Sequence, residues 1–123
     1  MKNIILLVFI ISSGCCASPK NATSVTIANT TTAVPGCIQK LIHQFSEEEK
    51  QNPPRKIYSY LYKGAKVYYV IAPCCDNFND LYDEYCTLLG HPDGGFTGRG
   101  DGKFPDFNET KTNEKIIWED KRK

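Results

Sequence analysis

The segment 56–72 constrains the fold of this 123-residue chain more than any other part of the sequence. It contains two runs rich in Tyr, Val, Ile and Leu, Lys56–Tyr62 and Ala65–Ala72, and only Lys63 and Gly64 separate them. A two-residue connection that contains glycine is typical of a β-hairpin, because glycine readily takes the positive φ of such turns. The sequence therefore predicts two antiparallel strands joined at Lys63-Gly64.

This turn also predicts which side chains share a face of the hairpin. Tyr60 would lie opposite Val67, and Tyr58 opposite Tyr69. Because side chains alternate along a strand, one face would carry Tyr58, Tyr60, Tyr62, Val67, Tyr69 and Ile71. The other face would carry Ile57, Ser59, Leu61, Lys66, Tyr68 and Val70. Aromatic cross-strand neighbours stabilise a sheet, so we expect the aromatic face to be core that lies under a helix.

A helix is predicted before the hairpin, from Gly36 to about Glu49. Its apolar residues recur at helical spacing and form one stripe, which consists of Ile38, Leu41, Ile42 and Phe45. Asn52-Pro53-Pro54 should end the helix, because the residue before a proline disfavours helical geometry.

The C-terminal segment predicts one more strand, Lys115–Glu119, followed by a frayed tail at 121–123. The predicted fold class is therefore α+β, with one N-terminal helix packed on a small antiparallel β-sheet. Residues 36–120 would form this single domain, cross-linked by disulfides.

Residues 76–89 are compatible with two structures. Their apolar residues keep helical spacing, namely Phe78, Leu81, Tyr82, Tyr85 and Leu89. A straight helix, however, would place Cys86 roughly 15 Å from Cys75 at 1.5 Å per residue. A disulfide needs Cα atoms within about 7 Å, so a bond from Cys86 to Cys74 or Cys75 would require a short hairpin with its turn at 83–85. We favour the hairpin slightly and keep the helix as the alternative.

The N-terminus has the pattern of an export signal. Lys2 precedes the apolar run Ile4–Ile11, and small residues lead into Cys15. A cysteine after Ser-Gly is typical of a bacterial lipobox, so we predict a signal peptide at 1–15, lipidation of Cys15 and a flexible, threonine-rich tether at 16–35. The chain would then be lipid-anchored in the cell envelope, at the outer membrane or the periplasmic face. Cleavage near Ala17 would instead give a secreted protein.

Four cysteines remain in the predicted domain: Cys37, Cys74, Cys75 and Cys86. In a small exported domain they indicate two disulfides. A zinc site is less favourable because Cys74 and Cys75 are adjacent, whereas structural zinc sites use separated pairs. In the simplest arrangement, Cys74 and Cys75 would each bond a distant partner, Cys37 and Cys86 in either order.

The charge balance gives no support to a nucleic-acid partner. The formal net charge is +1, and loss of Lys2 with the signal would leave equal numbers of acidic and basic residues. The only histidines are His43 and His91, and no catalytic constellation stands out. We therefore expect a non-enzymatic protein with neither a resident metal nor a cofactor.

The long loop 90–107 is the candidate functional segment. It contains six of the nine glycines, Gly90, Gly94, Gly95, Gly98, Gly100 and Gly102. Its candidate binding residues are His91, Asp93, Arg99 and Asp101, and its aromatic residues Phe96, Phe104 and Phe107 could pin it to the core. Long loops in compact domains are often functional. The loop could be purely structural, could bind calcium or another ligand, or could contact a partner.

The order of these motifs resembles a family of small, uncharacterised bacterial lipoproteins. The matching pieces are Cys37, Tyr58-x-Tyr60-x-Tyr62-Lys63-Gly64, Val67-Tyr68-Tyr69-Val70, Cys74-Cys75-Asp76, Leu81-Tyr82-Asp83-x-x-Cys86, Gly94-Gly95-Phe96-Thr97-Gly98 and Ile117-Trp118. The resemblance implies an envelope lipoprotein, favours strand and turn at Leu81-Tyr82-Asp83, and contributes no activity.

Together these features predict a lipid-anchored, non-catalytic domain that binds a protein partner in the envelope. A small exported hydrolase inhibitor is one alternative. A calcium- or ligand-binding lipoprotein that uses loop 90–107 is the other.

Overall fold

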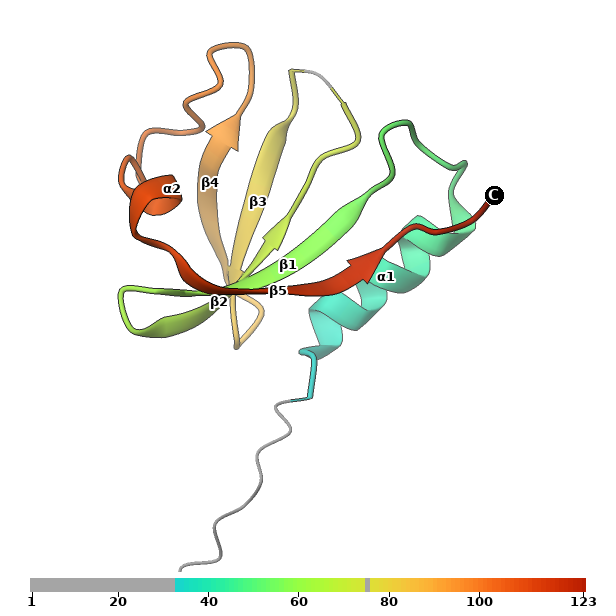
Figure 1. The fold of residues 1–123 in the computed structure, drawn as a ribbon, viewed down its shortest axis with the longest axis horizontal. Coiled ribbons are helices and arrows are strands. Elements are labelled where there is room, and N and C mark those ends of the chain that lie inside the picture. Colours follow the sequence, from blue (N-terminus) through green and yellow to red (C-terminus); the bar gives the residue numbers. More distant parts are fainter. Residues whose placement is uncertain (1–32, 75) are drawn as a thin grey trace, which may run out of the picture. The chain divides into compact units, whose positions relative to one another are not determined.

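The computed structural model describes residues 33–74 and 76–123. Its elements are α1 (Gly36–Glu47), β1 (Lys56–Tyr62), β2 (Ala65–Val70), β3 (Phe78–Asp83), β4 (Leu88–Gly94), α2 (Phe107–Thr110) and β5 (Thr112–Glu119). The strands form one sheet in the order β4-β3-β2-β1-β5, in which every neighbouring pair is antiparallel (Figure 1). The signal peptide, Cys15, Cys75 and all but the end of the tether fall outside the described residues.

The predicted hairpin is confirmed, with Tyr60 opposite Val67 and Tyr58 opposite Tyr69. Residues 78–94 form a second hairpin, β3–β4, so the helical alternative for 76–89 is wrong. Asp83 stabilises the turn between these strands, because its Oδ1 accepts hydrogen bonds from the backbone N–H groups of Tyr85 (2.9 Å) and Thr87 (2.8 Å). These local bonds favour a turn at this position, although the apolar residues of the segment are spaced as in a helix.

The helix covers a different face of the sheet from the one that the sequence suggested. Ile38 and Phe45 of α1 are buried with Ile57, Tyr68 and Val70. The expected face, with its tyrosines, is also core, but it packs against α2 and the end of the glycine loop. The buried members of that aromatic core are Tyr60, Tyr62, Val67, Tyr69, Leu81 and Phe107. The prediction that α1 lies over the aromatic face was wrong because both faces of β1 and β2 are apolar enough to be buried.

One disulfide joins α1 to the β3–β4 turn, between Cys37 and Cys86, with Cα atoms 5.7 Å apart. The prediction that these two cysteines would bond Cys74 and Cys75 was therefore wrong. The β3–β4 hairpin carries Cys86 back to the first turn of α1, where the backbone N–H of Cys37 also lies 3.3 Å from the Cys86 sulfur. Cys74 is disulfide-bonded as well, and its partner lies outside the described residues.

The C-terminal residues are not a frayed tail, because Arg122 caps the end of α1. Its guanidinium donates to the carbonyl oxygens of Phe45 (3.0 Å), Ser46 (2.7 Å) and Glu48 (2.9 Å). These carbonyls lie where a helix runs out of internal partners. Asp120 accepts further bonds from the same guanidinium, which lower the pKa of this carboxyl to about 2.

Across residues 33–74 and 76–123, no helix has both the length and the apolar character needed to cross a bilayer.

Candidate functional site

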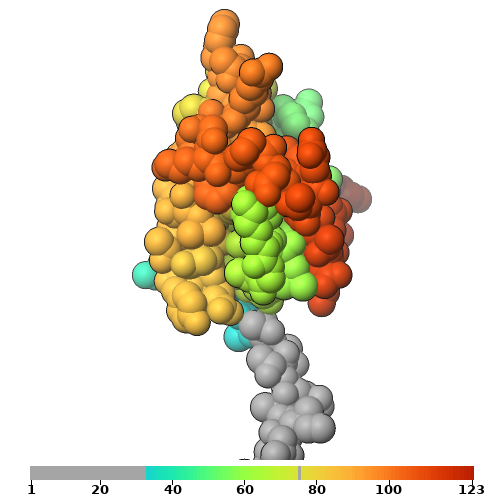
Figure 2. All heavy atoms as spheres, turned by 90° about the vertical axis from the view of Figure 1, so that its left-hand side faces the viewer, coloured from blue at the N-terminus to red at the C-terminus, as the bar shows by residue number. Residues whose placement is uncertain are grey.

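The glycine-rich segment is partly strand and partly loop. Residues 90–94 complete β4, and residues 95–106 form a loop that leads into α2. Figure 1 shows this loop extending beyond the end of the sheet, and in Figure 2 its first part, in orange, stands out at the top of the domain. The loop therefore presents an accessible surface at one end of β4.

Backbone hydrogen bonds fix the conformation of the 95–102 loop. The N–H of Gly95 donates to Asn77 O (2.9 Å), and the N–H of Gly100 donates to Gly94 O (3.2 Å). The N–H of Asp101 donates to His91 O (2.9 Å), which folds the loop back along the outer edge of β4. A loop with this many backbone bonds is largely pre-organised and would lose little conformational freedom on binding.

Gly100 is required where the returning loop touches β4. Its φ is +61°, and a Cβ at this position would meet the backbone oxygen of His91 and would lie 2.7 Å from the backbone nitrogen of Asp93. Gly98 has a similar φ of +72°, but no atom lies within 4 Å of its added Cβ. The loop thus uses glycine for two separate reasons, close approach at Gly100 and backbone conformation at both positions.

The three phenylalanines of this segment differ in their exposure to solvent. Phe107 is fully buried, and Phe104 packs on Tyr62 with ring centroids 6.1 Å apart. These two pin the loop to the aromatic core as predicted. Phe96 is 91% exposed, so the prediction that it helps to pin the loop was wrong. Its ring is displayed to solvent at the tip of a fixed loop.

Asp101 acts inside the loop. Its carboxylate accepts hydrogen bonds from the backbone N–H groups of His91 (3.1 Å) and Lys103 (3.0 Å), and the Lys103 ammonium lies 3.3 Å away. Desolvation opposes ionisation here, but these bonds outweigh it and lower the pKa of the Asp101 carboxyl. Asp101 therefore holds the loop closed against β4.

Asp93 belongs to a polar network on the aromatic face. Its Oδ1 accepts from the Tyr69 hydroxyl (2.6 Å) and the Asn79 amide (2.7 Å), and its Oδ2 accepts from the Asn108 amide (3.1 Å). Burial, followed by the bond to Asp93, raises the pKa of Tyr69 strongly. Since the carboxylates of Asp93 and Asp101 already serve as internal acceptors, a calcium ion would have to displace these donors.

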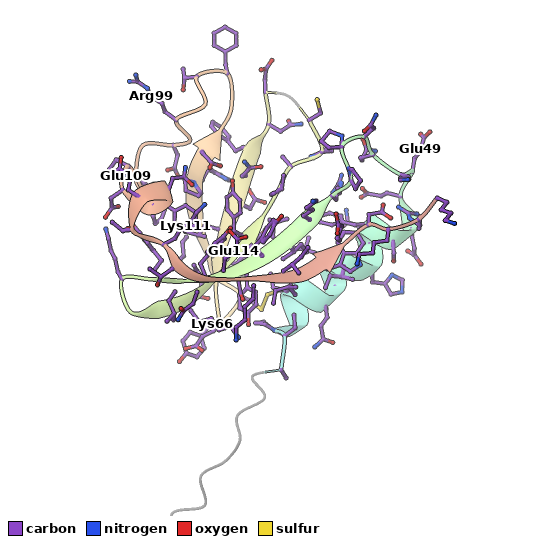
Figure 3. The ribbon with its side chains drawn as sticks, in the orientation of Figure 1. Glu49, Lys66, Arg99, Glu109, Lys111 and Glu114 are labelled. Atoms are coloured by element: carbon purple, nitrogen blue, oxygen red, sulfur yellow. A yellow bond between two sulfur atoms is a disulfide. The ribbon has the colours of Figure 1, made fainter. Side chains whose placement is uncertain are left out.

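Lys111 extends this network. Its ammonium donates to Asn108 Oδ1 (2.7 Å) and lies 4.7 to 5.3 Å from the ring centroids of Tyr60, Tyr69 and Phe107. Such cation–π contacts are favourable when the cation is partly desolvated. Figure 3 shows Lys111 beside β5, close to Glu114, which accepts a 2.7 Å bond from the Tyr60 hydroxyl.

A groove of about 360 Å³ lies between the loop and α2. Its lining residues are Pro92, Asp93, Gly98, Arg99, Gly102, Pro105 and Asn108. Arg99 is exposed, and Figure 3 shows it extending from the loop away from the sheet. The groove therefore contains one cation, Arg99, and one carboxylate, Asp93.

His91 lies in β4, where its ring stacks on Phe78 with centroids 5.0 Å apart and its Nδ1 lies 2.9 Å from Asp80 Oδ1. Of the four predicted site residues, Asp93 and Arg99 share the groove. His91 and Asp101 contact each other through a backbone N–H. The described residues contain no group of three or more His, Cys, Asp or Glu side chains arranged to hold a metal ion.

No direct signal in the sequence pointed to several residues around the site, namely Asn79, Asn108, Lys111 and Glu114. Asn79, an amide within a strand, could have been identified as a residue with a specific partner. Asn108 of α2, Lys111 directly after α2 and Glu114 of β5 carried no such signal.

Residues 43–120 match a family whose description is a domain of unknown function (DUF6970). The chain belongs to this family. The matched DUF6970 region begins within α1 and ends at Asp120, so it contains the whole sheet, the glycine-rich loop and α2. Cys37 lies before it, and the disulfide therefore joins the start of α1 to the matched region. No curated protein and no solved structure matches the chain.

Proposed function

We propose that this DUF6970 domain is a non-catalytic protein-interaction domain that uses the 95–102 loop and the adjoining groove as its contact surface. The observation that carries the proposal is the 91% exposure of Phe96 on a loop fixed by backbone hydrogen bonds. An exposed aromatic ring gains about 1.5 to 3 kcal/mol when it is transferred from water into an apolar pocket. Phe96 is therefore suited to anchor a partner.

The surroundings of Phe96 support the same proposal. Interfaces combine a few central aromatic or arginine anchors with a polar rim. Here Arg99, which is exposed, lines the groove and lies three residues after Phe96 in the same loop, would supply a charged hydrogen-bonding group. Because Asp101 already holds the loop against β4, little ordering would be needed when a partner binds.

The proposed setting of this interaction is the cell envelope. The export signal and the Ser13-Gly14-Cys15 step support lipidation of Cys15. A diacylated cysteine provides two chains, which suffice for stable anchoring. The tether 16–35 would connect this anchor to the domain, at the outer membrane or the periplasmic face. The protein would be secreted if Cys15 is not lipidated.

Co-purification from native envelopes tests the proposed surface. We expect Phe96→Ala to lower partner recovery strongly and to change the free energy of unfolding by less than about 0.5 kcal/mol, because the side chain is exposed. Tyr85→Ala is the matched control, since Tyr85 is 81% exposed in the turn at the other end of β4. Equal recovery of the same proteins by the wild type and Phe96→Ala would contradict the proposal.

Inhibition of an exported hydrolase is the second candidate, and the fixed projecting loop favours it. A pre-organised loop that carries an exposed Phe could enter an active-site cleft. A panel of proteases and lysozymes, assayed with the wild type and Phe96→Ala, separates this role from simple interaction. Inhibition that Phe96→Ala abolishes would support it.

A further inference from the structure

A second hollow lies on the α1 side of the sheet, away from the glycine-rich loop. Its volume is about 220 Å³, and it is lined by Ser59, Tyr60, Leu61, Lys66, Asn113 and Lys115. Typical ligand pockets measure about 300 to 1,000 Å³. This hollow therefore suits a small group or one end of a larger ligand.

A β-bulge shapes this hollow. Ser59 pairs with Lys115 and Leu61 pairs with Thr112, so Tyr60 has no partner residue on β5. Within the irregular stretch, Asn113 has a φ of +54°, a conformation that asparagine tolerates better than most residues. Bulges re-aim side chains and are common beside binding sites.

Two lysines give the hollow a positive charge. Neither Lys66 nor Lys115 forms an ion pair with any part of the chain that the structure describes. The ammonium of Lys66 instead lies 5.3 Å from the Tyr68 ring centroid. Glu114, the nearest carboxylate in sequence to Lys115, is bonded to Tyr60 on the opposite face of the sheet.

Other lysines of the β1–β2 hairpin are neutralised. Lys56, at the start of β1, lies 2.9 Å from Glu119, and Lys63, in the β1–β2 turn, lies 3.1 Å from Asp106. Lys66 and Lys115 lack such a carboxylate, which leaves two cationic donors available to a ligand.

Ser59 adds a hydroxyl to this hollow. The residue is only 3% exposed, and its side chain makes no hydrogen bond to residues 33–74 or 76–123. Its Oγ is not among the completely buried, unpartnered side-chain atoms of the described residues, so it remains open to the hollow. A ligand oxygen in the hollow would accept a hydrogen bond from it.

We infer that this hollow is a binding subsite for a phosphate-type oxyanion. The ammonium groups of Lys66 and Lys115 would balance its charge, and the Ser59 hydroxyl and Asn113 amide would donate to its remaining oxygens. Charge-assisted hydrogen bonds of this kind are among the stronger polar contacts. The phosphate could be free in solution or could belong to a lipid headgroup, and the two sources share this chemistry.

Thermal unfolding of the full chain tests the subsite, with inorganic phosphate as the probe and chloride at equal ionic strength as the reference. We expect a saturable rise in Tm with phosphate alone. Lys66→Met/Lys115→Met should weaken the apparent phosphate affinity at least about tenfold, since each substitution removes one charged hydrogen bond to the phosphate. Lys115→Gln provides a milder variant at an exposed position if the double variant does not fold.

Lys40→Met is the matched control, because Lys40 lies on the exposed side of α1 and, among the described residues, has no ion-pair partner. This variant should bind phosphate like the wild type. Dihexanoyl phosphatidylglycerol, kept below its micelle concentration, distinguishes the sources. A Tm rise with this lipid but not with dihexanoylglycerol, which lacks the phosphate, supports a headgroup ligand, and a rise with inorganic phosphate alone supports a free one.

Two results would overturn the inference. In the first, phosphate and chloride give the same Tm at every concentration. In the second, the rise specific to phosphate persists undiminished in Lys66→Met/Lys115→Met, or in Lys115→Gln where that variant is used.

Discussion

Substitution of alanine for two glycines of the loop tests whether its conformation is fixed by contact with β4. Gly98 and Gly100 have similar positive φ values, +72° and +61°, so both substitutions carry the backbone cost of a left-handed residue, about 1 to 2 kcal/mol. For Gly98→Ala this is the whole expected cost, because the added Cβ meets no atom within 4 Å.

Gly100→Ala should cost more. The added Cβ would meet the backbone of His91 and Asp93, so the loop must move away from β4. That movement would break two backbone bonds, Gly100 N–H to Gly94 O and Asp101 N–H to His91 O, each worth about 0.5 to 1.5 kcal/mol. The total is about 2 to 5 kcal/mol of unfolding free energy.

Urea unfolding measures this difference. The single tryptophan, Trp118, packs at the edge of the α1-side core and provides a fluorescence signal away from the loop. We expect Gly100→Ala to lose at least about 1 kcal/mol more than Gly98→Ala, since two more hydrogen bonds are broken. Equal losses would show that the loop does not depend on its contact with β4, and the argument for a pre-organised surface would then be wrong.

Three further predictions concern the anchor, the disulfide and the C-terminus. Mass spectrometry of the native protein should find a lipid-modified N-terminal Cys15, and an unmodified chain that starts at or after residue 17 would contradict this. Cys37→Ser/Cys86→Ser should lower the free energy of unfolding by about 4 kcal/mol, because the bond closes a loop with a sequence separation of 49; a loss below about 1 kcal/mol would refute that reasoning. The pKa of Asp120 falls from 3.8 to about 2 in the folded protein, so its pairing with Arg122 stabilises above about pH 4 and is lost as the pH falls toward 2. Arg122→Gln should reduce the pH dependence of the free energy of unfolding, measured by urea unfolding between pH 2 and 6. An unchanged pH dependence would show that the Asp120–Arg122 pair does not cause it.

Local signals in the sequence were sufficient for most of the strands. The Lys63-Gly64 connection determines both the β1–β2 turn and its register. The apolar stripe of α1 likewise predicts the residues that the helix buries, Ile38 and Phe45. In both cases, residues close in sequence decide the structure.

The face on which α1 packs could not be predicted in the same way. Ile57 and Tyr68 on one face of the hairpin are as apolar as Tyr60 and Tyr69 on the other, and both pairs are buried. The alternation of side chains along the strands therefore shows that both faces are apolar, but it does not show which face contacts α1. The choice depends on the Cys37–Cys86 link and on the way α2 closes the aromatic side.

The candidate site was predicted only in part for a related reason. The glycine content of the sequence located the loop. The sequence did not distinguish its three phenylalanines, Phe96, Phe104 and Phe107, of which only Phe96 is exposed in the structure. Asn108 and Arg122 act on partners 15 and 77 residues away, respectively, and short-range patterns carry no information about such contacts. Long-range hydrogen bonds therefore account for most of what the sequence left undetermined.

Site-specific photo-crosslinking at position 96 tests the central claim most directly. Phe96 is replaced by p-benzoylphenylalanine in the otherwise intact chain, and native envelopes are irradiated. Tyr85, replaced in the same way, is the control at the opposite end of β4. We predict a discrete protein adduct from position 96 that position 85 does not give. The same adducts from both positions, or none from position 96, would contradict a partner surface at the 95–102 loop.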